Sequence, residues 1–311
     1  MSLNIAFQMD PLEGLNLKDD TSLAIIIECL SKNHKVWHFL PKDVSYLDGS
    51  VYSICKNIYE INENMFPYYE CGGLNNKNLK DMDIIFIRQD PPFDMSYITS
   101  TYLLEYIEND VKIINKPSQI RNSPEKLFLN NWKNLTPSTL ITKNTKEILD
   151  FKEKNKNIII KPLYGNGGSG VFYIKEDDKN FNSLLEMFLK IESTQFIVQE
   201  YLPEITQGDK RVIMFDGDPV GAINRIPSAI DIRANMHVGG EAIKTRLSKN
   251  DLEICETIGP TLKEKGLFFV GIDIIGEKLT EINVTSPTGF REIQRLNDFN
   301  LAKLLLEKLN V

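Results

Sequence analysis

The chain has 311 residues, of which 42% are hydrophobic and 25% charged, and its formal net charge is −7 at pH 7. This composition is ordinary for a globular protein, and the length allows about two domains, each with its own core. The acidic balance argues against nucleic-acid binding, which needs a basic face. No segment approaches the run of ~20 apolar residues that crosses a bilayer, so we expect neither nucleic acid nor membrane as a partner.

The start of the chain and its cysteines suggest a cytoplasmic protein. The first apolar stretch is soon interrupted by Asp10 and Pro11, so we expect no secretion signal. Without such a signal, cysteines that lack the spacing of a metal site are expected to be free thiols in a reducing cytoplasm. They are Cys29, Cys55, Cys71 and Cys255.

The first third of the chain alternates predicted strands with predicted helices. We expect an open, largely parallel sheet, in which ligands lie beyond the carboxyl ends of the strands. Polar residues follow these strand ends and together predict a substrate pocket: Asp10, Arg88, Asp90 and Lys116. The predicted strands span residues 4–9, 36–40, 83–87 and 111–114, with helices at 21–31 and 97–109 and an irregular β-type excursion at 52–69.

A further helix and then a linker are predicted after the alternating region. Ser123 and Pro124 predict a helix start, with the serine as N-cap and the proline at the first helical position, and the helix should run to about Trp132. Residues 135–139 have the composition of a linker. The main domain boundary is therefore expected near residues 135–139, and after a predicted helix near 146–154 strands and hairpins replace the alternation.

A glycine-rich loop separates two predicted strands, Ile158–Pro162 and Val171–Ile174. A P-loop or a dinucleotide site would need a helix after the loop, so both are excluded. A loop between antiparallel strands can instead fold over a nucleotide and offer backbone N–H groups to its phosphates, with Lys161 adding a positive charge. The alternative is a plain hairpin with a surface lysine. The loop contains Gly165, Gly167, Gly168, Ser169 and Gly170.

Further candidates lie downstream. The strand Phe196–Pro203 can offer backbone groups to an adenine edge, although core packing explains the same pattern. Arg225 follows a predicted hairpin over 212–223, and Arg233 lies in a loop with Asn235. Such arginines can hold carboxylate or phosphoryl oxygens through paired hydrogen bonds; surface solubility is the alternative for each.

The segment Gly271–Val284 predicts two short strands joined by a turn at Gly276–Lys278. Side chains alternate across a strand, so Glu281 and Asn283 share one face, and Asp273 is expected to point the same way from the partner strand. Oxygen ligands without His or Cys suit Mg²⁺, which leaves most of its coordination to phosphates and water. The hairpin therefore predicts a metal site for a nucleoside triphosphate, with an ordinary half-solvated hairpin as the alternative.

The order of these motifs resembles that of the ATP-grasp ligases: Lys126, then Lys161 with the glycine loop, then residues 199–202, then the acidic hairpin. Longer runs are similar to bacterial glutathione synthetase, and the resemblance extends over residues 9–292. The sequence departs from the family pattern at Gln89, at 234–238 and at 289–290. The similar runs are residues 88–94, 115–117, 125–128, 208–211, 259–267 and 280–287.

The resemblance implies roles for individual residues. The metal ligands would be Asp273, Glu281 and Asn283, and the catalytic residues would be Arg225, Arg233 and Lys161. The nucleotide would be bound by Lys126, Lys161, Gly165, Gly167, Gly168, Ser169, Gly170, Gln199, Glu200, Tyr201, Leu202, Asp209 and Arg211. The remaining substrate would be bound by Asp10, Ser22, Arg88, Asp90, Asn235, Ser286 and Arg291.

The resemblance also implies a fold and a reaction. The fold would be α/β, an ATP-grasp fold with an N-terminal open parallel substrate domain (residues 1–122), a central lid (123–203) and a C-terminal α+β domain with the metal site (204–311). ATP, γ-glutamylcysteine and glycine would give glutathione, ADP and phosphate through an acyl phosphate, with Mg²⁺ (or Mn²⁺) as the cofactor. Members of the family are commonly homotetramers, so we expect one here.

Two other functions remain open at this point. A related ATP-grasp ligase could join a different acid and amine, of the peptide or D-alanine type, and ADP release with a panel of amines would distinguish it. A nucleotide-binding regulator without catalysis would have no need for the full set of lysines, acids and glycines. A nicotinamide dehydrogenase is disfavoured, because no Gly-x-Gly-x-x-Gly follows the first strand.

Overall fold

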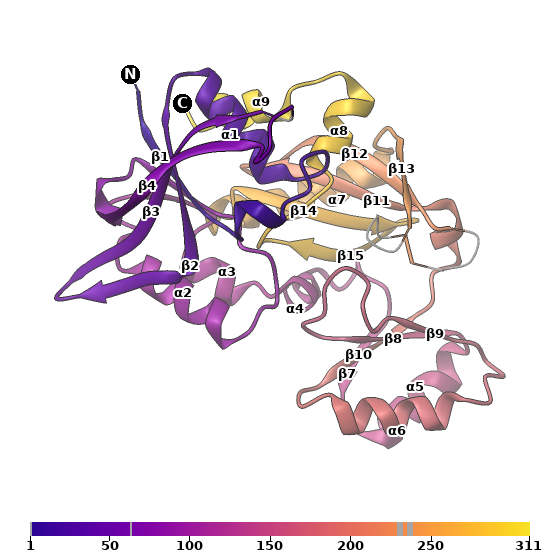
Figure 1. The fold of residues 1–311 in the computed structure, drawn as a ribbon. Helices are drawn as coiled ribbons and strands as arrows, with labels where there is room; N and C mark the ends of the chain where they lie inside the picture. The colour runs from indigo at the N-terminus through magenta and orange to yellow at the C-terminus, as the bar shows by residue number, and fades with distance from the viewer. Residues whose placement is uncertain (1, 63, 229–232, 235–238) are drawn as a thin grey trace.

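The computed structural model describes residues 2–62, 64–228, 233–234 and 239–311. Within these ranges the strands form three sheets of six, four and five strands. The first and third sheets, with their helices, make up a continuous body in which the two chain ends lie near each other, and the four-stranded sheet with its helices projects from that body (Figure 1). No helix of the described residues is long and apolar enough to cross a membrane.

The N-terminal sheet has the strand order β4-β3-β2-β1-β5-β6. The four strands β2, β1, β5 and β6 are parallel, as the alternating pattern predicts, whereas β3 and β4 extend the sheet antiparallel from β2. This extension replaces the irregular excursion expected at 52–69. The strands are β1 (Asn4–Gln8), β2 (Lys35–Leu47), β3 (Ser50–Ile61), β4 (Tyr69–Asn78), β5 (Ile84–Ile87) and β6 (Lys112–Ile114).

Helices cover both faces of this sheet. Ile5 and Phe7 of β1 pack in a core with α1 (Thr21–Ser31), and Ala6 packs on the other face with α2 (Met95–Glu105) and α3 (Pro117–Asn122). The helix α2 starts two residues before the predicted one because Asp94 caps it, accepting hydrogen bonds from the N–H groups of Ser96 and Tyr97. Short 3₁₀ turns occur at Leu12–Gly14 and Leu79–Asp81.

The predicted helix start at Ser123 is wrong by one position. The helix α4 (Glu125–Phe128) has Pro124 at its N-cap, and Ser123 instead ends α3, its N–H bonding the Ile120 carbonyl. The preceding helix takes up the backbone of Ser123, so its hydroxyl is not used as a cap. A 3₁₀ turn (Leu129–Trp132) continues α4.

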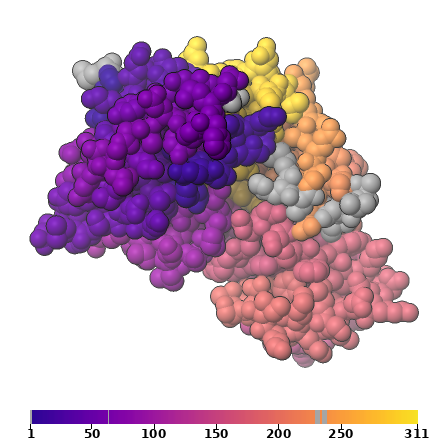
Figure 2. Space-filling view, viewed as in Figure 1, coloured from indigo at the N-terminus to yellow at the C-terminus, as the bar shows by residue number. Residues whose placement is uncertain are grey.

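The lid sheet has the order β7-β10-β8-β9, with all pairs antiparallel. This sheet and its helices have a core of their own, which includes Ile160, Val198 and Leu185. Figure 2 shows the lid as a distinct lobe below the body. Its elements are β7 (Thr139–Thr142), α5 (Thr145–Asn155), β8 (Ile158–Pro162), β9 (Phe172–Ile174), α6 (Phe181–Ile191) and β10 (Phe196–Glu200), followed by a 3₁₀ turn (Pro203–Gln207).

The C-terminal sheet has the order β13-β12-β11-β14-β15. One face packs on α7 (Lys249–Glu264), and the other shares a core with α8 (Phe290–Asn297), α9 (Leu301–Lys308) and the N-terminal sheet. Phe128 and Leu129 join the α7 side, so the α4 segment packs on this sheet. The strands are β11 (Asp209–Phe215), β12 (Asp218–Ile226), β13 (Glu241–Lys244), β14 (Phe269–Ile275) and β15 (Lys278–Asn283).

Candidate active site

A cleft of about 920 Å³ lies between the lid and the C-terminal sheet, and loops of the N-terminal domain close one end. Most residues singled out from the sequence line it together. Asn235 lies outside the described residues, and Gly170, Asp10, Ser22, Arg88 and Arg291 are not in the lining. The predicted residues in the lining are Asp90, Lys126, Lys161, Gly165, Gly167, Gly168, Ser169, Gln199, Glu200, Tyr201, Leu202, Asp209, Arg211, Arg225, Arg233, Asp273, Glu281, Asn283 and Ser286.

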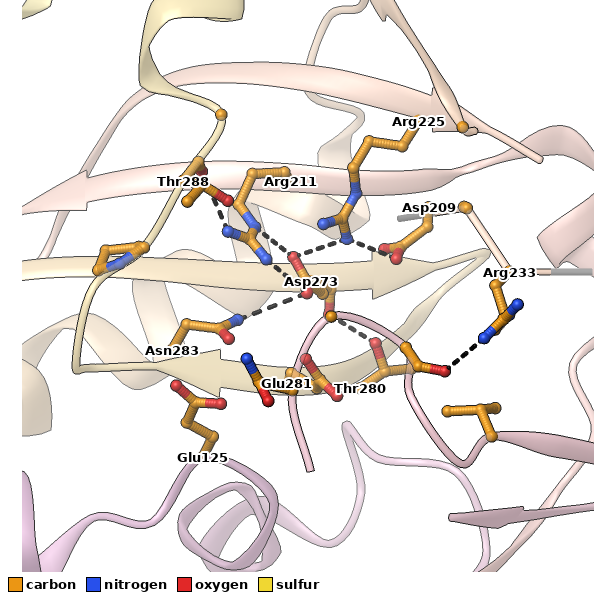
Figure 3. A pocket seen from close by; sticks show the side chains of 18 of the residues that line it. Glu125, Asp209, Arg211, Arg225, Arg233, Asp273, Thr280, Glu281, Asn283 and Thr288 are labelled. Atoms are coloured by element: carbon orange, nitrogen blue, oxygen red, sulfur yellow. Dashed lines mark hydrogen bonds and ion pairs between the residues drawn. The ribbon is translucent and has the colours of Figure 1, made fainter. Parts of the chain in front are cut away.

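The β14–β15 hairpin forms as the alternation predicts. Asp273 and Glu281 are partners across the two strands, and Asn283 pairs with Gly271 two residues along. Ile282 lies in the core on the opposite face. The carboxylates and the amide therefore point into the cleft from one surface, as Figure 3 shows.

Arginines on the neighbouring strands hold Asp273. Arg211 is its cross-strand partner and donates to both carboxylate oxygens, from Nε at 2.5 Å and from Nη2 at 2.9 Å. Arg225 approaches at 3.0 Å and also bonds its own cross-strand partner, Asp209. These four residues are each at most 8% exposed, so they form a buried array of two acids and two bases (Figure 3).

The two acids of this array have pKa values shifted in opposite directions. Burial alone would raise the pKa of Asp273, but Arg211 and Arg225 outweigh burial and hold that pKa well below its usual range. Burial raises the pKa of Asp209 to about 7, against the opposing effect of Arg225 and with a contribution from the negative Asp273. Asp273 is therefore the permanent anion of the pair.

Two lysines enter the cleft from different segments. Lys126, on α4, lies 3.6 Å from Glu281 and donates a hydrogen bond to the carbonyl of Gly165 in the glycine loop. Lys161, on β8, is buried, and burial lowers its pKa, with Glu281 opposing that shift. The acidic hairpin, a lysine and the lid loop thus meet at one place.

The glycine loop is held over the cleft at two points. Besides the Lys126 contact at Gly165, Arg233 Nη1 donates to the Gly168 carbonyl at 3.0 Å. Gly170 has φ of +69°, and a Cβ there would lie 2.8 Å from Pro162 Cγ, so this turn requires glycine. Gly170 therefore shapes the loop without lining the cleft.

The far end of the cleft is lined by the exit of β10. Gln199 Nε2 donates to Thr139 Oγ1 at 2.7 Å, and Glu200 accepts the Ser138 N–H at 2.9 Å. Tyr201 stacks on Tyr173 with ring centroids 4.1 Å apart. Apolar walls complete this end, contributed by Ile159, Leu202, Ile205 and Ile275. A flat aromatic base fits such a slot.

Several predicted substrate residues lie just outside the cleft lining, at the end formed by the N-terminal domain. Arg88 is 4% exposed; its Nε donates to Ser22 Oγ at 3.1 Å and its Nη2 to the Pro287 carbonyl at 3.2 Å. Asp10 accepts the Asp90 N–H at 2.8 Å. These contacts support the segments that line the cleft.

Ser286 and Arg291 lie at the same end. Ser286 Oγ donates to the Arg88 carbonyl at 3.3 Å, and Arg291 Nε donates to the Asp20 carbonyl, also at 3.3 Å.

Several residues of the cleft have no role predicted from the sequence. Glu125 lines the cleft beside Lys126 and accepts a hydrogen bond from Thr285 Oγ1 at 2.9 Å. Asp19 and Glu292 pair with Arg295 at the N-terminal end. Glu125 adjoins a lysine already singled out, which is a usable signal. Asp19, Glu292 and Arg295 come together only because α8 packs on the loop after β1, and no local sequence pattern predicts this contact.

The hairpin can hold a divalent cation. Glu281 and Asn283 present oxygens into the cleft beside Asp273, and a hard cation prefers such donors. The described residues contain no group of three His, Cys, Asp or Glu side chains arranged as a metal site. The donor set is thus two carboxylates and an amide, which fits an ion that takes its other ligands from phosphates.

Comparisons with known proteins agree along the whole chain. A family model described as the prokaryotic glutathione synthetase N-terminal domain matches residues 3–121, and one for the ATP-grasp domain of that family matches residues 125–298. Glutathione synthetase of Agrobacterium fabrum is 46% identical over 306 residues, 98% of this chain and 96% of the relative. That of Salmonella typhi is 39% identical over 309 residues, 99% and 98% of the two chains.

Solved structures of low identity show the fold. D-cycloserine synthetase DcsG has a TM-score of 0.68 at 11% identity, with 98% of this chain and 99% of that chain covered. The ATP-grasp ligase PsnB complexed with minimal precursor, Mg and ADP has a TM-score of 0.64 at 14% identity, covering 99% and 97%. With the family match, these likenesses confirm the ATP-grasp fold expected from the motifs.

Proposed function

The chain belongs to the prokaryotic glutathione synthetase family, and we propose how the residues of its cleft carry out the reaction of that family. It is an ATP-dependent ligase that joins γ-glutamylcysteine to glycine, giving glutathione, ADP and phosphate through an acyl phosphate. The roles proposed for individual residues rest on their contacts within the cleft.

The strongest support for the assignment is that Lys126 contacts both the β14–β15 hairpin and the glycine loop of the lid. Lys126 lies 3.6 Å from Glu281 and bonds the glycine loop at Gly165. Opposite charges from separate segments converge where a polyanion with its cation would fit. We place the terminal phosphates of ATP between Lys126, Lys161 and the backbone amides of the loop.

Mg²⁺, with Mn²⁺ as a substitute, would be held by Asp273, Glu281 and Asn283, and it would offset the charge of the phosphates. Arg211 fixes the rotamer of Asp273 through its two hydrogen bonds, so this ligand is in position before the ion arrives.

The nucleoside would occupy the slot at the end of β10. Backbone groups of Glu200 and Leu202 would meet the adenine edge, and Gln199 and Tyr201 would complete the walls. Asp209 Oδ1 is buried and has no hydrogen-bond partner among the described residues. That oxygen is suited to a ribose hydroxyl.

The chemical steps need positioning and charge stabilisation more than a protein base. The cysteinyl carboxylate of the dipeptide attacks the γ-phosphorus, the bond to the β–γ bridging oxygen breaks, and ADP leaves. The carboxylate is then an acyl phosphate, and Arg225 and Arg233 would stabilise the charge that develops. Glycine then loses a proton from its ammonium group, and the neutral amine attacks the acyl carbon. Phosphate leaves as the amide bond forms, and the second amine proton is lost to phosphate or water. The glycine loop, held by Lys126 and Arg233, excludes the water that would otherwise hydrolyse the acyl phosphate.

The dipeptide would lie against the N-terminal domain, where Asp90 and Ser286 line the cleft and Asp10, Ser22, Arg88 and Arg291 support or contact it. Asn235, outside the described residues, is proposed for the same region. We further propose a homotetramer working in the cytoplasm, on the family resemblance and on thiols that are free throughout the described chain.

The test is ADP release with purified protein, ATP, Mg²⁺ and γ-glutamylcysteine, while glycine is exchanged for other amines. We expect ADP release that requires both the dipeptide and glycine, with glutathione formed in equal amount. Release supported by a different acid and amine pair, with none for γ-glutamylcysteine and glycine, would contradict the substrate assignment.

A further inference from the structure

The reaction brings two ammonium groups into one cleft, and a carboxylate is a well-matched partner for each. One belongs to the glutamyl end of the dipeptide and the other to the acceptor amino acid. Five of the ten acidic side chains in the lining have cationic partners among the described residues. Asp273 and Asp209 pair with arginines of the buried array, Glu281 with Lys126, and Asp19 and Glu292 with Arg295.

Glu125 is different from these. In the part of the chain that the structure describes it has no ion pair, and its one hydrogen bond comes from the Thr285 hydroxyl to Oε1 at 2.9 Å. Its backbone neighbour Lys126 marks the phosphate end of the cleft. Figure 3 shows the Glu125 carboxylate beneath the β14–β15 hairpin, near Asn283 and Glu281. A free carboxylate therefore stands where the acyl phosphate would be attacked.

A small side chamber opens at this point. It has a volume of about 20 Å³, room for roughly one water-sized group such as an ammonium. Glu125, Lys126, Gly165, Asn166 and Thr285 line both the chamber and the main cleft. A group that enters the chamber beside Glu125 thus remains connected to the reacting centre.

Ser123 supplies a second polar group. Its side chain is 0% exposed and lines the same chamber, and its Oγ has no hydrogen-bond partner among the described residues. A buried hydroxyl without a partner is costly. An ammonium group has three donors and no acceptor, so one N–H can reach a carboxylate oxygen and another a hydroxyl oxygen.

The dipeptide has its own candidates at the other end. Asp20 and Asp90 line the cleft beside the buried Arg88. An ammonium and a carboxylate on one carbon, as at the glutamyl end, match a pair of acids with an arginine close by.

From these contacts we propose that Glu125 and Ser123 form the binding subsite for the ammonium group of the acceptor amino acid. The proposal rests on the ligase function above and assigns the acceptor to this side chamber. Glu125 binds the charge, Ser123 orients the group, and Thr285 holds the Glu125 carboxylate in place.

The experiment compares two acceptors of different charge. Glycine carries an ammonium group at neutral pH, whereas hydroxylamine is largely uncharged there and forms a hydroxamate with acyl phosphates. ADP formation is measured at saturating ATP and γ-glutamylcysteine with each acceptor varied. The proteins are wild type, Glu125→Gln, Ser123→Ala and, as a matched control, Glu256→Gln on the exposed side of α7.

We expect Glu125→Gln to raise the KM for glycine on the order of 10- to 100-fold, as for loss of a hydrogen-bonded charge. Its KM and kcat with hydroxylamine should stay within about threefold of wild type, because a neutral amine gains little from a carboxylate. Ser123→Ala should raise the KM for glycine by about 3- to 10-fold. Glu256→Gln should match wild type with both acceptors.

Equal losses with glycine and hydroxylamine, or an unchanged KM for glycine in both variants, would overturn the subsite. If Glu125→Gln does not fold, judged by its thermal unfolding midpoint, Ser123→Ala decides alone. Failure of the proposed function looks different, since wild type would then give no dipeptide-dependent ADP with either acceptor.

Discussion

The C-terminal sheet and the lid face each other across one cleft but hold their side chains in different ways. On the sheet, Asp273 is fixed by Arg211 and Arg225, all buried on adjacent strands. Among the described contacts, the glycine loop of the lid is held by hydrogen bonds from Lys126 and Arg233, and by a ring contact between Tyr164 and Phe93 with centroids 6.4 Å apart. The sheet is a preformed electrostatic surface, and the lid is a cover with few attachments.

In the proposed function the sheet holds the metal ion and the lid covers the substrates, and the difference suits these two tasks. A cation site gains from ligands that need no rearrangement when charge develops. A cover must open for substrate entry, so its contacts are drawn from the less stable interactions of the protein. We therefore expect stability defects from changes in the sheet and mainly kinetic defects from changes in the lid.

The largest effect is expected for Asp273→Asn. Removing this charge leaves Arg211 and Arg225 buried without their shared partner, at a cost of about 3–5 kcal/mol in the free energy of unfolding. Turnover should fall by about 10²–10³-fold. Urea unfolding and steady-state ADP release measure the two effects. Near-normal activity at saturating Mg²⁺ would reject the metal assignment, and unchanged stability would reject the anchoring array.

Glu281→Gln sharpens the comparison on the same hairpin. Glu281 is 23% exposed in its side chain and pairs only with Lys126 among the described residues. We expect a similar loss of turnover, about 10²–10³-fold, but a change of at most about 1 kcal/mol in unfolding free energy. Calorimetric titration with MgATP should show weakened binding. A large loss of stability would show that Glu281 belongs to the buried array.

Arg233→Ala tests the lid side. The variant loses one bond to the loop and a cation proposed to face the dipeptide, so the KM for γ-glutamylcysteine should rise by about tenfold. The KM for ATP should change less, and unfolding free energy should stay within about 0.5 kcal/mol. An altered KM for ATP with an unchanged KM for the dipeptide would assign Arg233 to the nucleotide instead.

The smallest effect is expected for Tyr164→Ala. Loss of the stacked contact with Phe93 removes about 0.5–1.5 kcal/mol from lid closure. The glycine loop should be cut a few times faster by a protease, and more ADP should be released per glutathione formed, because water reaches the acyl phosphate. MgATP should restore part of the protection. Wild-type coupling and cleavage rates would mean that the ring contact does not hold the lid.

The local features of the site could be predicted from the sequence, while its anchoring could not. Alternation along β15 and β14 puts Glu281, Asn283 and Asp273 on one surface, because strand periodicity is a local property. Arg211 lies 62 residues from Asp273, and only the pairing of β11 with β14 makes them partners. Strand pairing is decided by the whole core, which no local pattern contains.

Dependence on distant residues also explains why the prediction and the structure differ at β3, at β4 and at the start of α4. The strands β3 and β4 are partly exposed and polar, so their pattern resembled an irregular excursion. Ser123 has the residue type of a cap, but the end of α3 takes up its backbone. Glu125 gains its place from packing against the hairpin and Thr285. These roles depend on neighbours that are distant in sequence.

The most direct test of the shared phosphate and metal site is a crystal structure of the protein with Mg²⁺ and a non-hydrolysable ATP analogue. We predict a metal bound by Glu281, Asn283 and Asp273, and terminal phosphates within hydrogen-bond distance of Lys126, Lys161 and the backbone of the glycine loop. A triphosphate bound away from the hairpin, or a metal ligated by other side chains while Glu281 stays paired with Lys126, would contradict it.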